Sequence, residues 1–274
     1  MEEINFCKMS GSGNDFIIID NRKKIVAESG LTQFITAVCR RKLSVGADGL
    51  ILIEDSDKAD FRWRFFNADG SRAEMCGNGA RCAARFAVLN GIAATRLCFA
   101  TDAGVVKAEV NEDRVKVKMP DPVDLKLDYV VELDHGPRTV SSVNTGVPHV
   151  ISIEEHIDQI EIVDLGREIR NHPDFAPAGT NVNFIYRLNQ DSIAIRTYER
   201  GVEDETLACG TGSIASALIS ACKLDMVSPV HVQTRSGEYL TIFFNQNNDS
   251  FTDIYMQGDA RIIYRGNLHR DAWC

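Results

Sequence analysis

Two cysteines stand in the same short pattern at two places in the chain. Residues 76–87 read CGNGARCAARFA, and residues 209–220 read CGTGSIASALIS. Cys76 and Cys209 each open a C-G-x-G segment that leads into a run of small and apolar residues, and each follows a predicted strand and a polar loop. The two copies begin 133 residues apart, close to half the chain, which indicates two copies of one domain rather than a solenoid.

A cysteine directly before a buried helix lies beside backbone N–H groups that have no partner inside the helix. Together with the helix dipole, these groups form a site that favours anions. A thiol at such a site is expected to have a pKa below its free value, so that thiolate is accessible near neutral pH. The glycines allow the backbone to approach a ligand, and the same N–H groups could hold a substrate carboxylate. Either motif alone is explained as well by a helix cap beside a tight glycine turn.

Two thiols on opposite sides of one cavity suit stereoinversion at an acidic carbon. One thiolate removes the proton from one face, and the other thiol delivers a proton to the opposite face. Reversal exchanges the roles, so the two groups should be of the same type. N–H groups from both helix starts would stabilise the charge that develops on the substrate carboxylate.

The rest of the chain predicts mostly short strands, with period-two patterns such as VKVKM at 115–119. Strands are expected at 139–143 and 183–188 with none between them, and helices at 31–41, 77–90, 165–171 and 210–224. The helices after the two cysteines are apolar on nearly all sides, which predicts that each is buried. The expected fold is therefore α/β (mixed α+β), with two pseudo-symmetric domains, each a mostly antiparallel, barrel-like sheet around a central buried helix. The prolines of MPDP at 119–122 place the boundary there, giving domains 1–119, joined by the C-terminal segment 265–274, and 120–264.

Composition excludes several classes of protein. The 274 residues carry a net charge of -9, which argues against nucleic acid as a partner. The N-terminal segment lacks an apolar signal region, and no apolar run is long enough for a membrane helix, so we expect a cytoplasmic protein without a membrane partner. In that compartment thiols stay reduced, and Cys7, Cys39, Cys82, Cys98 and Cys222 are expected to be small buried hydrophobes. No zinc spacing, phosphate loop or dinucleotide fingerprint is present, so no metal and no cofactor are expected.

Longer segments around the cysteines resemble the diaminopimelate epimerase family. FFNADGSRAEMCGNGARC (65–82) and YERGVEDETLACGTG (198–212) are similar to its two signature segments. KMSGSGNDF (8–16), VGADGL (45–50), TGVPHV (145–150) and GTNVNF (179–184) are also similar, and the matches run in order along the whole chain. The resemblance implies a pyridoxal-independent isomerase that interconverts LL- and meso-diaminopimelate in lysine and often peptidoglycan synthesis. It also implies two similar α/β domains with the active site between them, and a homodimer.

The resemblance assigns roles to particular positions. Cys76 and Cys209 match the catalytic pair. The matched substrate-binding positions are Asn14, Asn67, Gly77, Asn78, Asn181, Glu199, Arg200, Gly210 and Thr211, and His149 and Glu199 match side chains that lie near the cysteines. Gly49 and Val147 depart from the family, because many members have Gln and Asn there, and each loses a polar group expected near the substrate.

Other interpretations of these residues stay open at this stage. Arg200 beside Glu199 could be a solvated ion pair, Asn67 and Asn78 could simply favour turns, and His149 could be a core histidine with satisfied ring nitrogens. Gly49 and Val147 motivate a second enzymatic hypothesis, a racemase for another amino acid such as glutamate. A third hypothesis is a thiol redox switch or binding module in which Cys76 and Cys209 form a reversible disulfide.

Overall fold

The computed structural model describes residues 3–134 and 136–273. The chain forms two compact units, Met1–Val117 with Gly258–Cys274, and Lys118–Gln257. The sequence places the first boundary at 119/120, two residues further on, and the return to the first domain at residue 265. The return comes earlier, at Gly258, because β18 (Arg261–Leu268) pairs along its length with β1 (Ile4–Gly11). Residue 274, the end of the expected C-terminal segment, lies outside the described residues.

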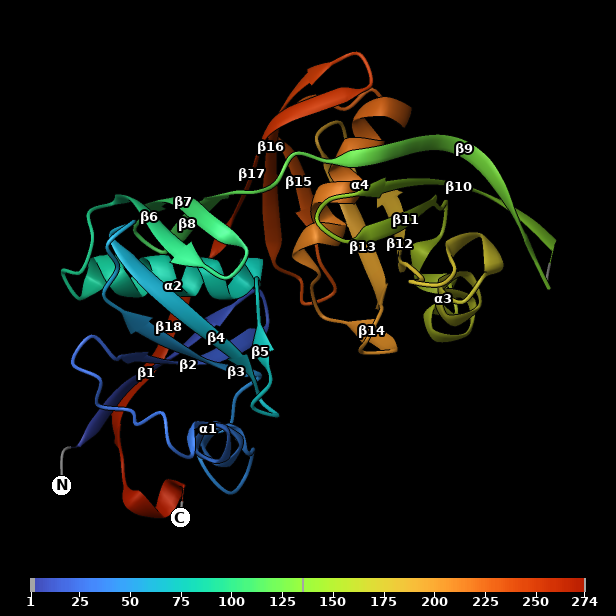
Figure 1. Cartoon of the computed structure of the whole chain (residues 1–274). Coiled ribbons are helices and arrows are strands. Elements are labelled where there is room, and N and C mark those ends of the chain that lie inside the picture. The colour runs from blue at the N-terminus through green and yellow to red at the C-terminus, as the bar shows by residue number, and fades with distance from the viewer. Residues whose placement is uncertain (1–2, 135, 274) are drawn as a thin grey trace. The chain divides into compact units, whose positions relative to one another are not determined.

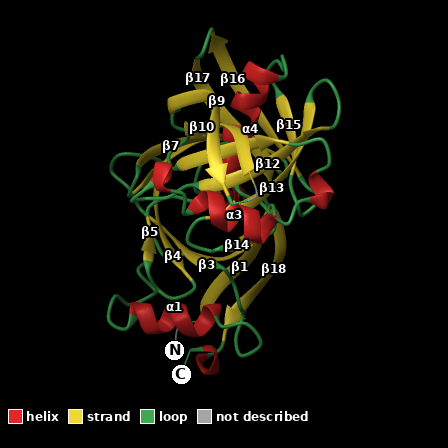
Figure 2. Cartoon of the chain, turned by 90° about the vertical axis from the view of Figure 1, so that its right-hand side faces the viewer, coloured by secondary structure: helices red, strands yellow, loops and turns green. Residues whose placement is uncertain are grey.

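Strands dominate both units, and helices are few (Figure 2). The first unit contains, besides β1 and β18, the elements β2 (Asn14–Asp20), α1 (Leu31–Cys39), β3 (Gly49–Glu54), β4 (Phe61–Asn67), β5 (Arg72–Ala73), α2 (Gly77–Leu89), β6 (Arg96–Thr101), β7 (Gly104–Asn111) and β8 (Arg114–Lys118).

The second unit contains a similar series. Its elements are β9 (Val123–Leu133), β10 (Gly136–Asn144), β11 (Pro148–Ile153), α3 (Ile162–Arg170), β12 (Asn181–Arg187), β13 (Ser192–Glu199), β14 (Asp204–Thr206), α4 (Gly210–Lys223), β15 (Val230–Gln233), β16 (Tyr239–Asn247) and β17 (Ser250–Asp259), with short 3-10 turns at Ile157–Gln159 and Pro173–Phe175. The sequence pattern did not predict β11, which falls between the expected strands 139–143 and 183–188. β11 pairs in parallel with β12, and burial of both faces removes the period-two alternation that marks an exposed strand.

The strand pairings of the two units correspond element by element. In the first unit β1–β2 is antiparallel, β2–β3 parallel, β3–β4 antiparallel, β4–β6 parallel and β6–β7 antiparallel. In the second unit β10–β11, β11–β12, β12–β13, β13–β15 and β15–β16 repeat that order of directions. α1 and α3 follow equivalent strands, and so do α2 and α4. The fold class predicted from the repeated C-G-x-G segment, a duplicated mixed α/β domain, is therefore confirmed.

α2 and α4 are the central helices of their units. α2 contacts β1, β2, β3 and β7, and α4 contacts β10 to β13, β15 and β16 (Figure 1). Most residues of both helices are buried, as their apolar composition predicts. Because a helix surrounded by strands cannot shift along its axis without breaking many contacts, the first residue of each helix has a well-defined position.

A second helix covers the opposite side of the first unit's sheet. Phe34 and Ile35 of α1 pack with Ile17, Leu52 and other residues of the β2–β3 layer, whereas Ile51 lies beside α2 near Gly79. Both faces of β2 and β3 are therefore covered, which explains the apolar runs FIIID and LILIE.

Candidate active site

Cys76 and Cys209 are the N-cap residues of α2 and α4. Both have extended backbone angles, with φ -148° and ψ 118° at Cys76 and φ -118° and ψ 112° at Cys209. The Cys76 Sγ accepts a hydrogen bond from the Gly79 N–H at 3.5 Å, and the Cys209 Sγ accepts one from the Gly212 N–H at 3.4 Å. Each sulfur thus takes the place that a Ser or Asp oxygen has in an ordinary helix cap, and a bond of this kind favours the charged form of the acceptor.

The glycines three residues after each cysteine have different neighbours. A Cβ on Gly212 would lie 2.4 Å from the Asn183 Oδ1 and 3.2 Å from the Cys209 Sγ. A Cβ on Gly79 would meet only the ends of apolar side chains, at 3.3 Å from the Ile51 Cδ1 and 3.4 Å from the Trp63 Cζ3. A polar side chain is therefore packed closely against Gly212, whereas the nearest neighbours of Gly79 are apolar.

The amide of Asn14 is bonded at both ends within the first unit. Its Oδ1 accepts from the Asn78 Nδ2 at 2.5 Å, and its Nδ2 donates to the Asp48 Oδ2 at 3.2 Å. The Asn78 Oδ1 in turn accepts from the fully buried Arg81 at 3.0 Å. Burial lowers the pKa of Arg81 below its usual range. These bonds join Asn14 to the α2 helix start.

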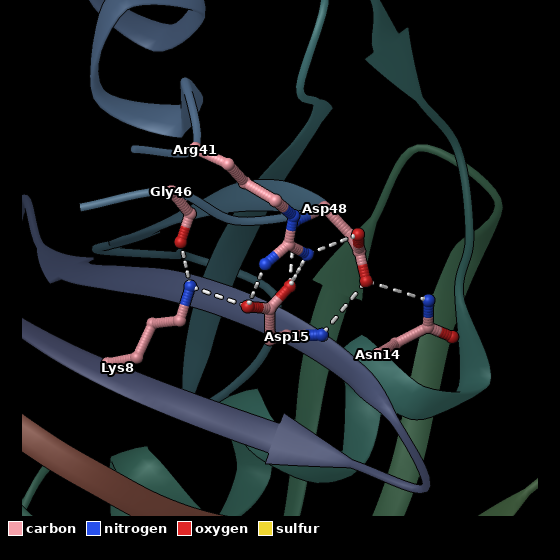
Figure 3. Close-up of polar contacts among 6 residues, drawn as sticks. All are labelled: Lys8, Asn14, Asp15, Arg41, Gly46 and Asp48. Carbon is pink, nitrogen blue, oxygen red and sulfur yellow. Dashed lines mark hydrogen bonds and ion pairs between the residues drawn. The ribbon is translucent and has the colours of Figure 1, made fainter. Parts of the chain in front are cut away.

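The other end of this chain of bonds is a cluster of charges (Figure 3). Asp48 also accepts from Arg41 at 2.9 Å, and Arg41 grips Asp15 with two bonds, at 2.7 and 3.1 Å. The buried Lys8 contacts Asp15 at 2.8 Å and also donates to the Gly46 carbonyl. Burial alone would raise the pKa of Asp15, but the hydrogen bonds from Arg41 and Lys8 outweigh it and hold that pKa below the usual value. Asp48 therefore stands between an ionic cluster and the predicted binding residue Asn14.

Asn67 ends β4, and its strand partner is Gly49, the first residue of β3. The Asn67 side chain donates to the Ser71 Oγ at 3.0 Å within a turn, as its type favours. A Cβ on Gly49 would lie 2.6 Å from the Phe66 carbonyl oxygen and 2.7 Å from a Phe65 ring carbon. No side chain fits at position 49 on this backbone, so the absence of Gln there is tied to the packing of β4.

Asn181 and Arg200 are joined in the second unit. The Asn181 Oδ1 accepts from the Arg200 N–H at 2.9 Å, and its Nδ2 donates to the Pro148 carbonyl at 3.1 Å. The Arg200 guanidinium donates to the Ala178 carbonyl at 3.1 Å. Asn181 therefore fixes the main chain at the start of the loop after β13, where Arg200 lies.

Glu199 accepts a hydrogen bond from the Thr206 hydroxyl at 2.8 Å. Its pKa is raised by burial, which the Thr206 bond only partly offsets. At the start of α4, the Thr211 hydroxyl lies 3.6 Å from the Cys209 Sγ. The Thr211 carbonyl accepts from the Thr145 hydroxyl at 3.0 Å. That second bond ties the α4 helix start to the segment that contains Val147.

His149 is almost fully buried, at 1% exposure, and burial together with the nearby charge of Arg200 lowers its pKa to about 3. Its Nδ1 lies 3.1 Å from the Asn183 Nδ2. Its Nε2 has no hydrogen-bond partner among the residues that the structure describes. The interpretation of His149 as a core histidine with both nitrogens satisfied is therefore wrong for Nε2.

The predicted residues gather in two groups, one in each unit. The first unit holds Asn14, Asn67, Cys76, Gly77 and Asn78, and the second holds His149, Asn181, Glu199, Arg200, Cys209, Gly210 and Thr211.

The residues that have polar contacts to these groups and were missed from the sequence include Asp48, Arg81 and Asn183. Two of them had a signal, because Arg81 is a charge inside an apolar helix pattern, and Asn183 follows Asn181 at the spacing that puts two strand residues on one face.

The remaining cysteines differ in burial. Cys7, Cys39 and Cys82 are buried as expected, but the expectation is wrong for Cys98 and Cys222, which are only partly buried. Burial raises the pKa of Cys39 to about 12 and raises that of Cys82 as well.

Within 3–134 and 136–273, no three His, Cys, Asp or Glu side chains are grouped so that they could hold a metal ion. Over the same residues, no helix has the length and apolar character needed to cross a bilayer.

The family model and the relatives with similar sequences point to the same family. The family model described as "Diaminopimelate epimerase" matches residues 6–125 and 141–263. A diaminopimelate epimerase of Aquifex aeolicus is 45% identical over 98% of this chain and 99% of the relative, and one of Archaeoglobus fulgidus is 44% identical over 97% and 96%.

Among solved structures, a phenazine biosynthesis protein of the PhzF family from Bacillus anthracis has a TM-score of 0.73 at 16% identity, covering 98% of this chain and 100% of that one. A hydroxyproline epimerase from Agrobacterium vitis has a TM-score of 0.68 at 15% identity, covering 98% and 93%. At these identities the likeness is one of fold. The sequence matches over nearly the full length show that this chain belongs to the diaminopimelate epimerase family.

Proposed function

We propose that this chain is an isomerase that interconverts LL- and meso-2,6-diaminopimelate by exchanging the α-proton between Cys76 and Cys209. The observation that carries the proposal is the equivalent placement of the two thiols. Each is the N-cap of a buried central helix, and each Sγ accepts an N–H bond from the glycine three residues on. Family membership supplies the substrate class.

The reaction balances with these two groups alone. One cysteine, as thiolate, takes the α-proton and becomes a thiol, and the electron pair of the C–H bond stays on the α-carbon and spreads into the carboxylate. The other cysteine, as thiol, gives its proton to the opposite face and becomes a thiolate. The N–H groups of Gly77 and Asn78, and of Gly210 and Thr211, lie in the first helical turn, where they have no partner within their own helix. They would stabilise the carboxylate charge, which is why no cofactor is proposed.

The predicted binding residues of the two units differ in charge, and this difference suits a substrate whose distal end carries both an ammonium group and a carboxylate. The first unit offers the amides of Asn14 and Asn67, which can donate and accept. The second offers Glu199, a carboxylate suited to an ammonium group, and Arg200, a guanidinium suited to a carboxylate. We assign these residues, with Asn181 holding the Arg200 main chain, to the distal amino and carboxylate groups of the substrate.

The wider setting goes beyond the reaction itself. A role in lysine and peptidoglycan precursor synthesis and a homodimer are proposed from what membership of this family implies, and a cytoplasmic location is proposed from the sequence.

Isotope exchange tests the reaction directly. The reduced protein is incubated in deuterium oxide with LL-diaminopimelate, and separately with single enantiomers of glutamate and proline. Deuterium entering the α-carbon of diaminopimelate together with formation of the meso isomer supports the proposal. Exchange into glutamate alone would replace it with the racemase hypothesis. Absence of exchange into any amino acid under reducing conditions would favour the redox-switch hypothesis.

The two cysteines are tested by Cys76→Ala and Cys209→Ala. Each variant should lose epimerisation by at least about 10³-fold, because a positioned acid or base contributes on this order, while the circular dichroism spectrum stays unchanged. Cys98→Ala, at a half-buried cysteine outside both motifs, is the matched control and should keep its activity. Full turnover by either motif variant would refute the assignment.

A further inference from the structure

Asn183 lies between His149 and the α4 helix start. It belongs to β12, which pairs in parallel with the β11 strand that carries His149. A Cβ on Gly212 would lie 2.4 Å from the Asn183 Oδ1 and 3.2 Å from the Cys209 Sγ. Asn183 is completely buried, so its amide must use its hydrogen bonds within the protein.

The orientation of the Asn183 amide is determined by a partner that can only accept. One end of the amide lies 3.1 Å from the Val150 carbonyl oxygen, so that end must be the NH₂ group. The other end accepts from the Thr197 hydroxyl at 3.0 Å. The same NH₂ group lies 3.1 Å from the His149 Nδ1, which must therefore be an acceptor. An imidazole whose Nδ1 accepts carries its proton on Nε2 when it is neutral.

We propose that Asn183 is a positioning residue that holds His149 as the neutral Nε2–H tautomer, so that His149 serves the cysteine chemistry as a hydrogen-bond donor to an anionic group and not as a base. This inference rests on the proposed function for the identity of the anion, which is a cysteine thiolate or the substrate carboxylate. The protonated imidazolium is excluded because it would place an N–H against the Asn183 NH₂ group.

The environment of His149 supports a donor role. Burial and the charge of Arg200 both act against a positive imidazole. The Nε2–H is buried without a partner in the described part of the chain, and a buried donor left unpaired is unfavourable. A bound anion that accepts from it would recover that free energy.

Nuclear magnetic resonance tests the tautomer without any activity measurement. The full chain is labelled with 15N-histidine, and the His149 signals are assigned by their loss in His149→Gln. We expect a protonated Nε2, an unprotonated Nδ1, and no titration between pH 5 and 8. A protonated Nδ1, or titration near the ordinary histidine pKa, would overturn the proposal.

Two variants test whether Asn183 is the cause. Asn183→Asp replaces the NH₂ group by a carboxylate oxygen and should move the His149 proton to Nδ1 or add a second one. Thr197→Val is the matched control, because it removes a bond to the same amide but leaves the Val150 contact that orients it, so the tautomer should be unchanged. An unchanged tautomer in Asn183→Asp would show that Asn183 does not hold it.

Two substitutions of His149 separate a donor from a base. Gln places an amide NH₂ near the position of Nε2 and cannot act as a base at neutral pH, whereas Leu removes both functions. For a donor, His149→Gln should keep the rate of diaminopimelate exchange within about fivefold, and His149→Leu should lose about 10- to 100-fold, as expected for a hydrogen bond to a charged group. Equal losses in the two variants would assign His149 as a base.

Because the tautomer is read from the resting protein, a wild type that exchanges no amino acid would overturn the proposed function and leave the result on Asn183 standing.

Discussion

The equivalent glycines of the two motifs, Gly79 and Gly212, should respond very differently to the same substitution. In Gly212→Ala the new Cβ would lie 2.4 Å from the Asn183 Oδ1. To reach ordinary contact the Asn183 amide must move by about 1 Å. That movement strains its bonds to the Val150 carbonyl, the His149 Nδ1 and the Thr197 hydroxyl.

The size of the destabilisation depends on which hydrogen bonds of the Asn183 amide are lost. Losing one or two of these buried bonds costs about 1–3 kcal/mol each, so we expect Gly212→Ala to lower the free energy of unfolding by roughly 2–5 kcal/mol. In Gly79→Ala the Cβ meets only apolar side-chain ends at 3.3 Å or more, which can shift slightly. The higher helix propensity of Ala offsets part of the crowding, by up to about 1 kcal/mol, so the net change should be small.

Urea unfolding followed by far-ultraviolet circular dichroism measures the difference between the two variants. Both keep the backbone N–H that donates to the neighbouring cysteine sulfur, so the comparison isolates the steric term. Equal destabilisation of the two variants would refute the reasoning, because it would mean that Asn183 relaxes freely. Deuterium exchange into diaminopimelate should fall in parallel with stability for Gly212→Ala and remain near wild type for Gly79→Ala.

Three further predictions concern the groups around the two cysteines. The folded-state pKa of His149 is about 3, against 6.5 for the free group, so the unfolded chain binds the extra proton and stability falls as pH drops from 6.5 toward 3. The free energy of unfolding changes by about 1.4 kcal/mol per pH unit in this range. His149→Gln should therefore remove roughly 2 kcal/mol of the loss of stability between pH 7 and 5. Curves of unfolding free energy against pH that superimpose for the two proteins would contradict this. Asp48→Asn should raise the KM for diaminopimelate by about tenfold with little change in kcat, because the anchor of the Asn14 amide loses its charge; an unchanged KM would exclude a role for Asp48. Arg81→Met should lower the free energy of unfolding by about 2 kcal/mol or more, since it leaves the Asn78 Oδ1 without its buried donor. Urea unfolding measures this change, and an unchanged free energy of unfolding would contradict the prediction.

The duplicated fold supplies two similar frameworks with different linings. Asn67 and Glu199 are the last residues of the equivalent strands β4 and β13, and Gly49 and Asn181 are the first residues of the equivalent strands β3 and β12. The first unit therefore presents a neutral amide where the second presents a carboxylate. A symmetric scaffold that holds two like thiols can in this way carry unlike binding groups for the rest of a substrate.

The amino-acid sequence by itself determined the repeated motif, the fold class and the apolar central helices. Each of these depends on short-range features, namely a cysteine and two glycines at a helix start, helix-length apolar runs, and period-two strands. The same features predicted that Cys76 and Cys209 would cap helices, because capping involves only residues within one turn.

The tertiary structure alone decided the contacts between residues that are distant in the chain. The Asn183 amide touches His149, and Asp48 reaches Asn14, only because particular strands are neighbours in the sheet. The same amide lies against Gly212 because α4 packs on β12. The return of the chain to the first unit at Gly258 depends in the same way on the pairing of β18 with β1. Local residue patterns carry no record of which strands pair or which buried polar atoms meet, since these follow from the packing of the whole domain. For this reason the sequence could propose candidate site residues, but it could not show which neighbours would surround each of them.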